Sequence, residues 1–104
     1  MFEIRDYQTD DGKRPFVLWF EALQDVKARA IILARLGRVQ LGNFGDYKSL
    51  GDEVYELRIH FGPGYGVYFG IDGRNIVLLL LGGSKRTQQR DIQKAREFWQ
   101  DYLS

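Results

Sequence analysis

The pattern of apolar and polar positions predicts a strand and then two helices in the first 45 residues. Residues 2–7 alternate between apolar and polar side chains, as a half-buried strand does. Pro15 suits the first position of a helix, and Asp25 can cap a second one. The first helix carries apolar residues at helical spacing: Phe16, Trp19, Phe20 and Leu23. The stripe predicted for the second helix comprises Val26, Ala30, Leu33 and Leu41, widened by Ile31, Ile32, Leu36 and Val39.

The second half of the chain predicts three strands and a closing helix. Strands are expected over residues 54–61, 65–71 and 75–81, with turns at Gly62-Pro-Gly64 and Asp72-Gly73 between them. The third strand is apolar on both faces, which is typical of a central strand. Gly82-Gly83 is expected to end it, and a helix is expected over residues 87–103. Residues 46–53 resemble a loop.

Strands and helices are therefore grouped in runs, which favours an α+β fold. We expect a small, mostly antiparallel sheet with an N-terminal helical hairpin and a C-terminal helix. A chain of 104 residues is long enough for one domain with one modest core.

Composition narrows the possible functions. The chain has no cysteine and one histidine, which excludes a disulfide framework, a cysteine nucleophile and a multi-histidine zinc site. No metal or cofactor is expected. Residues 2–11 carry charges throughout, and the longest apolar run, residues 76–81, is too short to span a bilayer. These features predict a cytoplasmic protein without a membrane partner.

The net charge is +1, but the charges are unevenly distributed. Acidic residues predominate in residues 1–25. In residues 84–96, five basic residues stand against Asp91 alone: Lys85, Arg86, Arg90, Lys94 and Arg96. A basic end can attract phosphate locally even in a nearly neutral protein. The simpler alternative is that these charges belong to solvated helix faces.

Strand periodicity places three candidate side chains on one line. In residues 54–61, Glu56, Arg58 and His60 point to one face, and the apolar residues between them point to the core. The next strand adds Tyr68 to the same face, between two glycines that leave room for a ligand backbone. The alternative is an ordinary polar sheet face with a Glu56–Arg58 ion pair.

These residue types suit the cleavage of RNA without a metal, because the 2′-hydroxyl of RNA can attack the adjacent phosphate. The reaction needs in-line orientation, proton transfer and cations that stabilise the phosphate. His60 can transfer a proton near neutral pH, and Glu56 can act as a base. Arg58, Lys85 and Arg86 can hold phosphate. Lys85 and Arg86 precede a helix N-terminus, where an anion is favoured and a cation is not.

Two segments resemble the RelE/ParE superfamily of type II toxins, and most closely its HigB-like branch, the addiction-module killer proteins. They are Val54-Tyr-Glu-Leu-Arg-Ile-His-Phe-Gly-Pro-Gly-Tyr65 with Val67-Tyr-Phe69, and Leu80-Leu-Gly-Gly-Ser-Lys-Arg-Thr-Gln88. The resemblance extends over nearly the whole chain. It implies a single RelE/ParE-like toxin domain over residues 1–104. It also implies a cognate antitoxin, often a helix-turn-helix DNA-binding protein, that holds the toxin inactive.

The family residues match this chain at some positions and not at others. In the RNA-cutting members, basic residues stand where Arg58 and His60 stand here, and a basic pair matches Lys85 and Arg86. The chain departs from the family at Gly66, where Arg is usual, and at Ile92, where some members have Tyr. The predicted catalytic residues are His60, Glu56, Arg58 and Arg86. The predicted RNA- or phosphate-binding residues are Arg58, Lys85, Arg86, Arg90 and Tyr68.

The predicted function is that of a toxin that cuts messenger RNA on the ribosome and so inhibits translation. Its expected partners are the antitoxin, the ribosome and messenger RNA. Two alternatives stay open because of Gly66. One is a ParE-like toxin that binds DNA gyrase without cutting nucleic acid, and the other is a degenerate toxin that retains only antitoxin binding.

Overall fold

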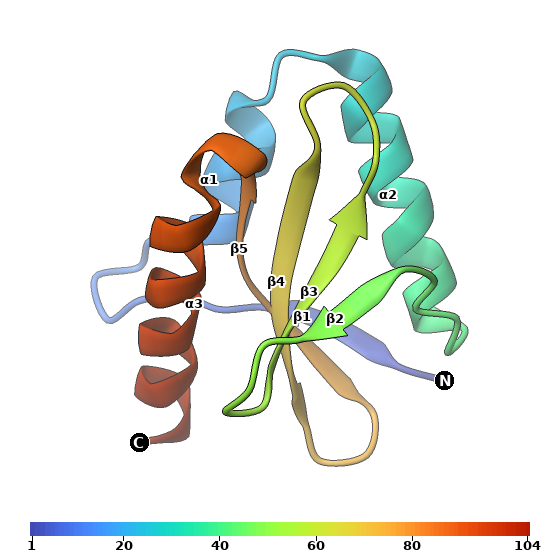
Figure 1. Cartoon of the computed structure of the whole chain (residues 1–104). Coiled ribbons are helices and arrows are strands. Elements are labelled where there is room, and N and C mark those ends of the chain that lie inside the picture. The colour runs from blue at the N-terminus through green and yellow to red at the C-terminus, as the bar shows by residue number, and fades with distance from the viewer.

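A five-stranded mixed sheet forms the centre of the molecule, with helices on both of its faces (Figure 1). The computed structural model describes residues 1–104. The strand order is β1-β5-β4-β3-β2, in which β1 runs parallel to β5 and the other neighbours are antiparallel. The elements are β1 (Glu3–Asp6), α1 (Pro15–Ala22), α2 (Val26–Gln40), β2 (Tyr47–Ser49), β3 (Val54–Ile59), β4 (Tyr65–Asp72), β5 (Ile76–Ser84), a 3-10 turn (Lys85–Thr87) and α3 (Gln88–Leu103).

The predicted N-terminal helical hairpin is wrong. The chain begins with strand β1, which pairs with β5 and makes the sheet mixed. The helix α1 has only eight residues and packs mainly against β5. The longer helix α2 is tied separately to β3, because the Arg35 guanidinium donates a 2.6 Å hydrogen bond to the carbonyl of Arg58. Each helix therefore buries its apolar side chains against the sheet instead of forming a hairpin unit.

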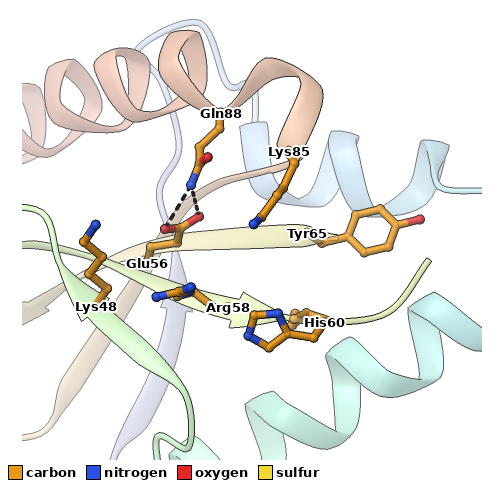
Figure 2. A pocket seen from close by; sticks show the side chains of 8 residues that line it. Lys48, Glu56, Arg58, His60, Tyr65, Lys85 and Gln88 are labelled. Atoms are coloured by element: carbon orange, nitrogen blue, oxygen red, sulfur yellow. Dashed lines mark hydrogen bonds between the residues drawn. The ribbon is translucent and has the colours of Figure 1, made fainter. Parts of the chain in front are cut away.

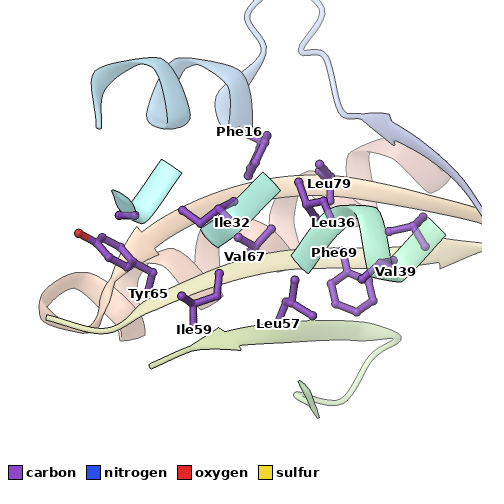
Figure 3. Close-up of a cluster of buried hydrophobic side chains, with 12 residues drawn as sticks. Phe16, Ile32, Leu36, Val39, Leu57, Ile59, Tyr65, Val67, Phe69 and Leu79 are labelled. Carbon is purple, nitrogen blue, oxygen red and sulfur yellow. The ribbon is translucent and has the colours of Figure 1, made fainter. Parts of the chain in front are cut away.

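Apolar side chains form two cores, one on each face of the sheet. The first lies beneath α1 and α2, and Figure 3 shows its side chains; they include Phe16, Ile32, Leu36, Leu57, Val67, Phe69 and Leu79. The second lies beneath α3 and comprises Tyr7, Val54, Tyr68, Leu78, Leu80, Ala95 and Trp99. The face predicted to be open is therefore mostly covered by α3. It stays polar only near Glu56 and Arg58.

Helix α2 begins as predicted, but only part of its predicted apolar stripe is buried, namely Ile32, Leu36 and Val39. The Asp25 carboxylate caps it by accepting hydrogen bonds from the amides of Lys27 and Ala28, at 3.0 and 3.1 Å. The buried side chains are Ala28, Ile32, Leu36 and Val39, whereas Val26, Leu33 and Leu41 are exposed. The helix is apolar on two sides, so periodicity alone did not identify the side that packs. None of the helices combines the length and apolar character needed to cross a membrane.

Strand β5 is central, as predicted, but it is longer than expected. It continues through Gly82 and Gly83 to Ser84. A Cβ on Gly82 would overlap the Trp19 ring, and one on Gly83 would overlap the Asp91 carboxylate. The two glycines therefore let α1 and α3 approach the strand closely instead of ending it. The short strand β2 lies in residues 46–53, which were expected to form a loop.

Candidate functional site

A hollow of about 230 Å³ opens where β2 and β3 approach the turn before α3 (Figure 2). Four residues predicted for the site meet here: Glu56, Arg58, His60 and Lys85. The other lining residues are Lys48, Ile59, Tyr65 and Gln88. Figure 2 shows Lys48, Arg58 and Lys85 reaching toward this space from β2, β3 and the 3-10 turn. Three cations from three elements thus surround one buried carboxylate.

Glu56 forms the floor of the hollow. Its side chain is buried, with 4% of the residue exposed, and a buried carboxylate needs hydrogen bonds. Gln88 Nε2 donates to both carboxylate oxygens, at 3.0 and 3.3 Å, and the Tyr68 hydroxyl donates at 3.4 Å. Burial, together with the charge of Glu56, raises the pKa of Tyr68, so this hydroxyl stays protonated. No basic side chain lies within 4.0 Å of the Glu56 carboxylate, which leaves the surrounding cations available to an anion.

Asp46 and His60 form a hydrogen-bonded pair at the rim of the hollow. The distance from His60 Nε2 to Asp46 Oδ2 is 2.5 Å, and Arg58 Nε lies 4.0 Å from the same oxygen. The Asp46 carbonyl accepts hydrogen bonds from the Arg58 amide and the Arg35 guanidinium, both at 2.9 Å, which fixes its position. An ionised carboxylate only accepts, so Nε2 carries the proton of this contact. Nδ1 of the neutral ring is then left as an acceptor.

Replacing His60 by alanine is expected to raise the pKa of Asp46 toward its ordinary value. The hydrogen bond from His60 is the main cause that lowers this pKa, and the charge of Arg58 lowers it further. Because the folded pKa lies below the unfolded one, the ionised Asp46 stabilises the fold above the unfolded pKa. That contribution is lost as the pH falls through the folded pKa. Carboxyl ¹³C NMR titration measures the change.

Asp11 is the internal control for this titration. It is also exposed and has a lowered pKa, but Thr9 is the main cause there. Its titration should be the same in both proteins. An unchanged Asp46 titration in the His60→Ala protein would contradict the Asp46–His60 contact.

Gly66 lies opposite Arg58 in the β3–β4 ladder. The space left by its missing side chain is occupied by other side chains of the protein. A Cβ on Gly66 would lie 2.5 Å from Glu56 Oε2 and 3.0 Å from the Tyr68 hydroxyl. At the next glycine of the same face, Gly70, a Cβ would overlap the Trp99 ring. The space assigned to a ligand backbone from the sequence is therefore filled by Glu56 and Trp99.

A second hollow, of about 340 Å³, adjoins the first along the N-terminal end of α3. Lys85 and Gln88 line both hollows, whereas Arg86 and Arg90 line the second but not the first. We call the resulting row of basic residues the cationic track: Lys48, Arg58, Lys85, Arg86 and Arg90. Four of the five form no ion pair within 4.0 Å, and Arg58 has only its contact with Asp46.

One residue predicted for the site from the sequence, Tyr68, lines neither hollow, and three residues near the site were not predicted. Tyr68 is buried and reaches only the floor carboxylate. Asp46, Lys48 and Gln88 were missed. Lys48 lies directly opposite Glu56 in the β2–β3 ladder, but a strand of three residues is too short to show a period of two. No group of three or more His, Asp or Glu side chains lies close enough together to hold a metal ion.

The fold and the site together define a small α+β protein with a cationic track beside an aspartate–histidine pair. It is 47% identical over 81 residues to an uncharacterized protein of Haemophilus influenzae, and the match covers 78% of this chain and 82% of that protein. The chain belongs to the same family as that protein. No family model matches the chain.

Proposed function

We propose that this chain is a type II toxin of the RelE/ParE superfamily, in the HigB-like branch, that cuts messenger RNA on the ribosome. It acts in the cytoplasm and is held inactive by a cognate antitoxin. The observation that carries the proposal is the cationic track beside the Asp46–His60 pair. The roles of the ribosome and the antitoxin in this proposal are inferred from the sequence resemblance.

The cationic track supports binding of a phosphodiester backbone. Lys85, Arg86 and Arg90 have no carboxylate partner, so a phosphate does not have to displace one. Arginine can bind phosphate through two parallel hydrogen bonds, and lysine adds a mobile charge. Because two adjoining hollows share Lys85, successive phosphates of one strand can lie in neighbouring positions along the track.

RNA supplies its own nucleophile in this mechanism. The 2′-oxygen forms a bond to the adjacent phosphorus while the bond from phosphorus to the 5′-oxygen breaks. The products are a 2′,3′-cyclic phosphate and a 5′-hydroxyl. His60 Nδ1 accepts the proton of the 2′-hydroxyl, the Asp46 carboxylate stabilises the imidazolium that results, and water protonates the leaving 5′-oxygen. Arg58 and Lys85 stabilise the charge that builds on the phosphate.

Glu56 is the other candidate base, but its geometry favours a supporting role. Both of its oxygens accept from Gln88, and one also accepts from Tyr68. A proton taken up by Glu56 would weaken these hydrogen bonds in a buried place. The proposal therefore assigns proton transfer to the more exposed His60.

A purified translation system tests the proposal. Ribosomes translating an end-labelled messenger RNA should yield fragments with 5′-hydroxyl ends when the protein is added. These ends are identified because polynucleotide kinase labels them without prior phosphatase treatment. The His60→Ala protein should cut more slowly, by about a hundredfold. Arg74→Ala, in the exposed β4–β5 turn, should cut normally. Intact RNA with the unmodified protein would contradict the proposal.

A ParE-like toxin that binds DNA gyrase is the second candidate. The observation that favours it is Gly66, because the Glu56 carboxylate occupies the space that the arginine usual in the family would need. Induction of the chain in a bacterial host separates the two functions. DNA-damage signalling with intact transcripts would indicate gyrase, and the absence of any growth effect would indicate a chain that only binds its antitoxin.

A further inference from the structure

A line of apolar residues runs along the outer face of α2. Val26, Leu33 and Leu41 are 74%, 56% and 73% exposed, and Ala30 and Gly37 between them are exposed too. Positions 26, 30, 33 and 37 recur at intervals of four, three and four, so they lie on one side of the helix. Scattered apolar residues are common on protein surfaces, but an aligned set on one helix is typical of an interaction surface. We call this set the outer line of α2.

Gly37 adds a second observation at the same place. Apart from its chain neighbours and the nearby backbone of its own helix, no atom lies within 4 Å of the position that its Cβ would take. Glycine is unfavourable inside a helix compared with alanine, and no packing within the chain requires it here. A glycine between Leu33 and Leu41 lets another helix approach the backbone closely.

The charge on α2 has one sign. The helix carries four basic residues and no acidic one. Arg35 turns inward to the carbonyls of Phe44, Asp46 and Arg58. On the helical repeat, Lys27 and Arg38 lie on one side of the outer line and Arg29 lies on the other. Positive charge therefore borders the apolar line on both sides.

We propose that the outer line of α2 is the docking site for an acidic amphipathic helix of a partner protein. Apolar side chains of that helix would pack along the line, and its Asp and Glu residues would meet Lys27, Arg29 and Arg38. A second copy of this chain is disfavoured, because two α2 faces would oppose like charges.

This surface is separate from the hollow. Helix α2 packs on one face of the sheet, and Glu56 with α3 lies on the other face (Figure 1). The inference therefore stands whether or not the hollow cuts RNA.

A display library of helical peptides tests the docking site. Randomised residues in the peptides allow any stripe and any charge, and the whole protein serves as the target. Selected peptides should carry Leu or Ile at helical spacing with Asp or Glu beside them. Leu33→Glu should weaken their binding at least tenfold. The matched control is Leu18→Glu on α1, because Leu18 is also 56% exposed and the charge change is the same.

Charge-reversal variants test the role of the basic residues independently. Lys27→Glu with Arg38→Glu should weaken binding at least tenfold, whereas Lys13→Glu with Arg74→Glu should leave it within twofold. Circular dichroism confirms that each variant is folded. The proposal is overturned if no peptide is recovered, if the peptides lack acidic enrichment, or if Leu33→Glu binds like the unmodified protein. A dimer in sedimentation experiments that Leu33→Glu dissociates would overturn it as well, since the occupant would then be a second copy.

Discussion

Replacing Arg58 by alanine is expected to slow RNA cleavage by about a hundredfold to a thousandfold while the fold stays intact. The guanidinium lies in the hollow with 39% of its side chain exposed, and its only ion-pair partner is Asp46, at 4.0 Å. The contacts that position this residue in the sheet are made by its backbone: its amide donates to Asp46, and its carbonyl accepts from Arg35. Alanine keeps both. The substitution therefore removes the proposed phosphate ligand and little structural support.

The rate of cleavage in the translation system measures this effect. Arg58→Lys should fall between alanine and the native residue, because lysine keeps the charge but loses the two-pronged hydrogen bonding of arginine. The thermal unfolding midpoint of each variant shows whether the fold has changed. Normal cleavage by both Arg58→Ala and Arg86→Ala would remove the phosphate-binding role from the cationic track.

Replacing Trp99 by alanine is expected to lower the free energy of unfolding by about 3–5 kcal/mol. Trp99 is 1% exposed and lies in the core beneath α3, where it stacks on Tyr102 with ring centroids 5.6 Å apart. Gly70 has no side chain where the indole rests on β4. The truncation would leave a cavity that the rigid sheet cannot fill. Domains of this size are stable by about 5–15 kcal/mol, so the loss is a large share.

Urea unfolding followed by circular dichroism measures this loss. Leu103→Ala is the matched control, because it also shortens an apolar side chain on α3 but at a residue that is 50% exposed. It should cost less than about 1 kcal/mol. Equal stability of the two variants would show that the second core contributes little.

Much of the fold was predicted from local sequence patterns, whereas the pairing of strands distant in the sequence was not. The Asp25 cap, the Pro15 helix start and the alternation in β3 depend on neighbours in the sequence, and each was predicted. The pairing of β1 with β5 joins residues more than 70 positions apart, and no local pattern encodes it. The buried side of α2 was predicted only in part for another reason. Two sides of this helix are apolar, and only one of them can pack on the sheet.

Part of the geometry of the candidate site was also predicted from the sequence. Alternation along β3 correctly put Glu56 and Arg58 on one face, and the hollow brings His60 and Lys85 to them. The role of Gly66 could not be deduced, because a glycine in the sequence shows that a side chain is missing but not which group occupies the space. Asp46 was missed because its contact with His60 depends on how β2 folds back along β3.

The parallel pairing of β1 with β5 has a consequence for synthesis of the chain. Strand β1 is made first, but its partner begins only at Ile76. Tyr7, just after β1, obtains its partners later still, because its amide donates a hydrogen bond to the Leu79 carbonyl and its hydroxyl donates one to Asp101. A nascent chain therefore carries an unpaired first strand until β5 has left the ribosomal exit tunnel. The five-stranded sheet cannot form before that point of translation. The hollow, which also needs Lys85 and Gln88, is completed at the same late stage of synthesis.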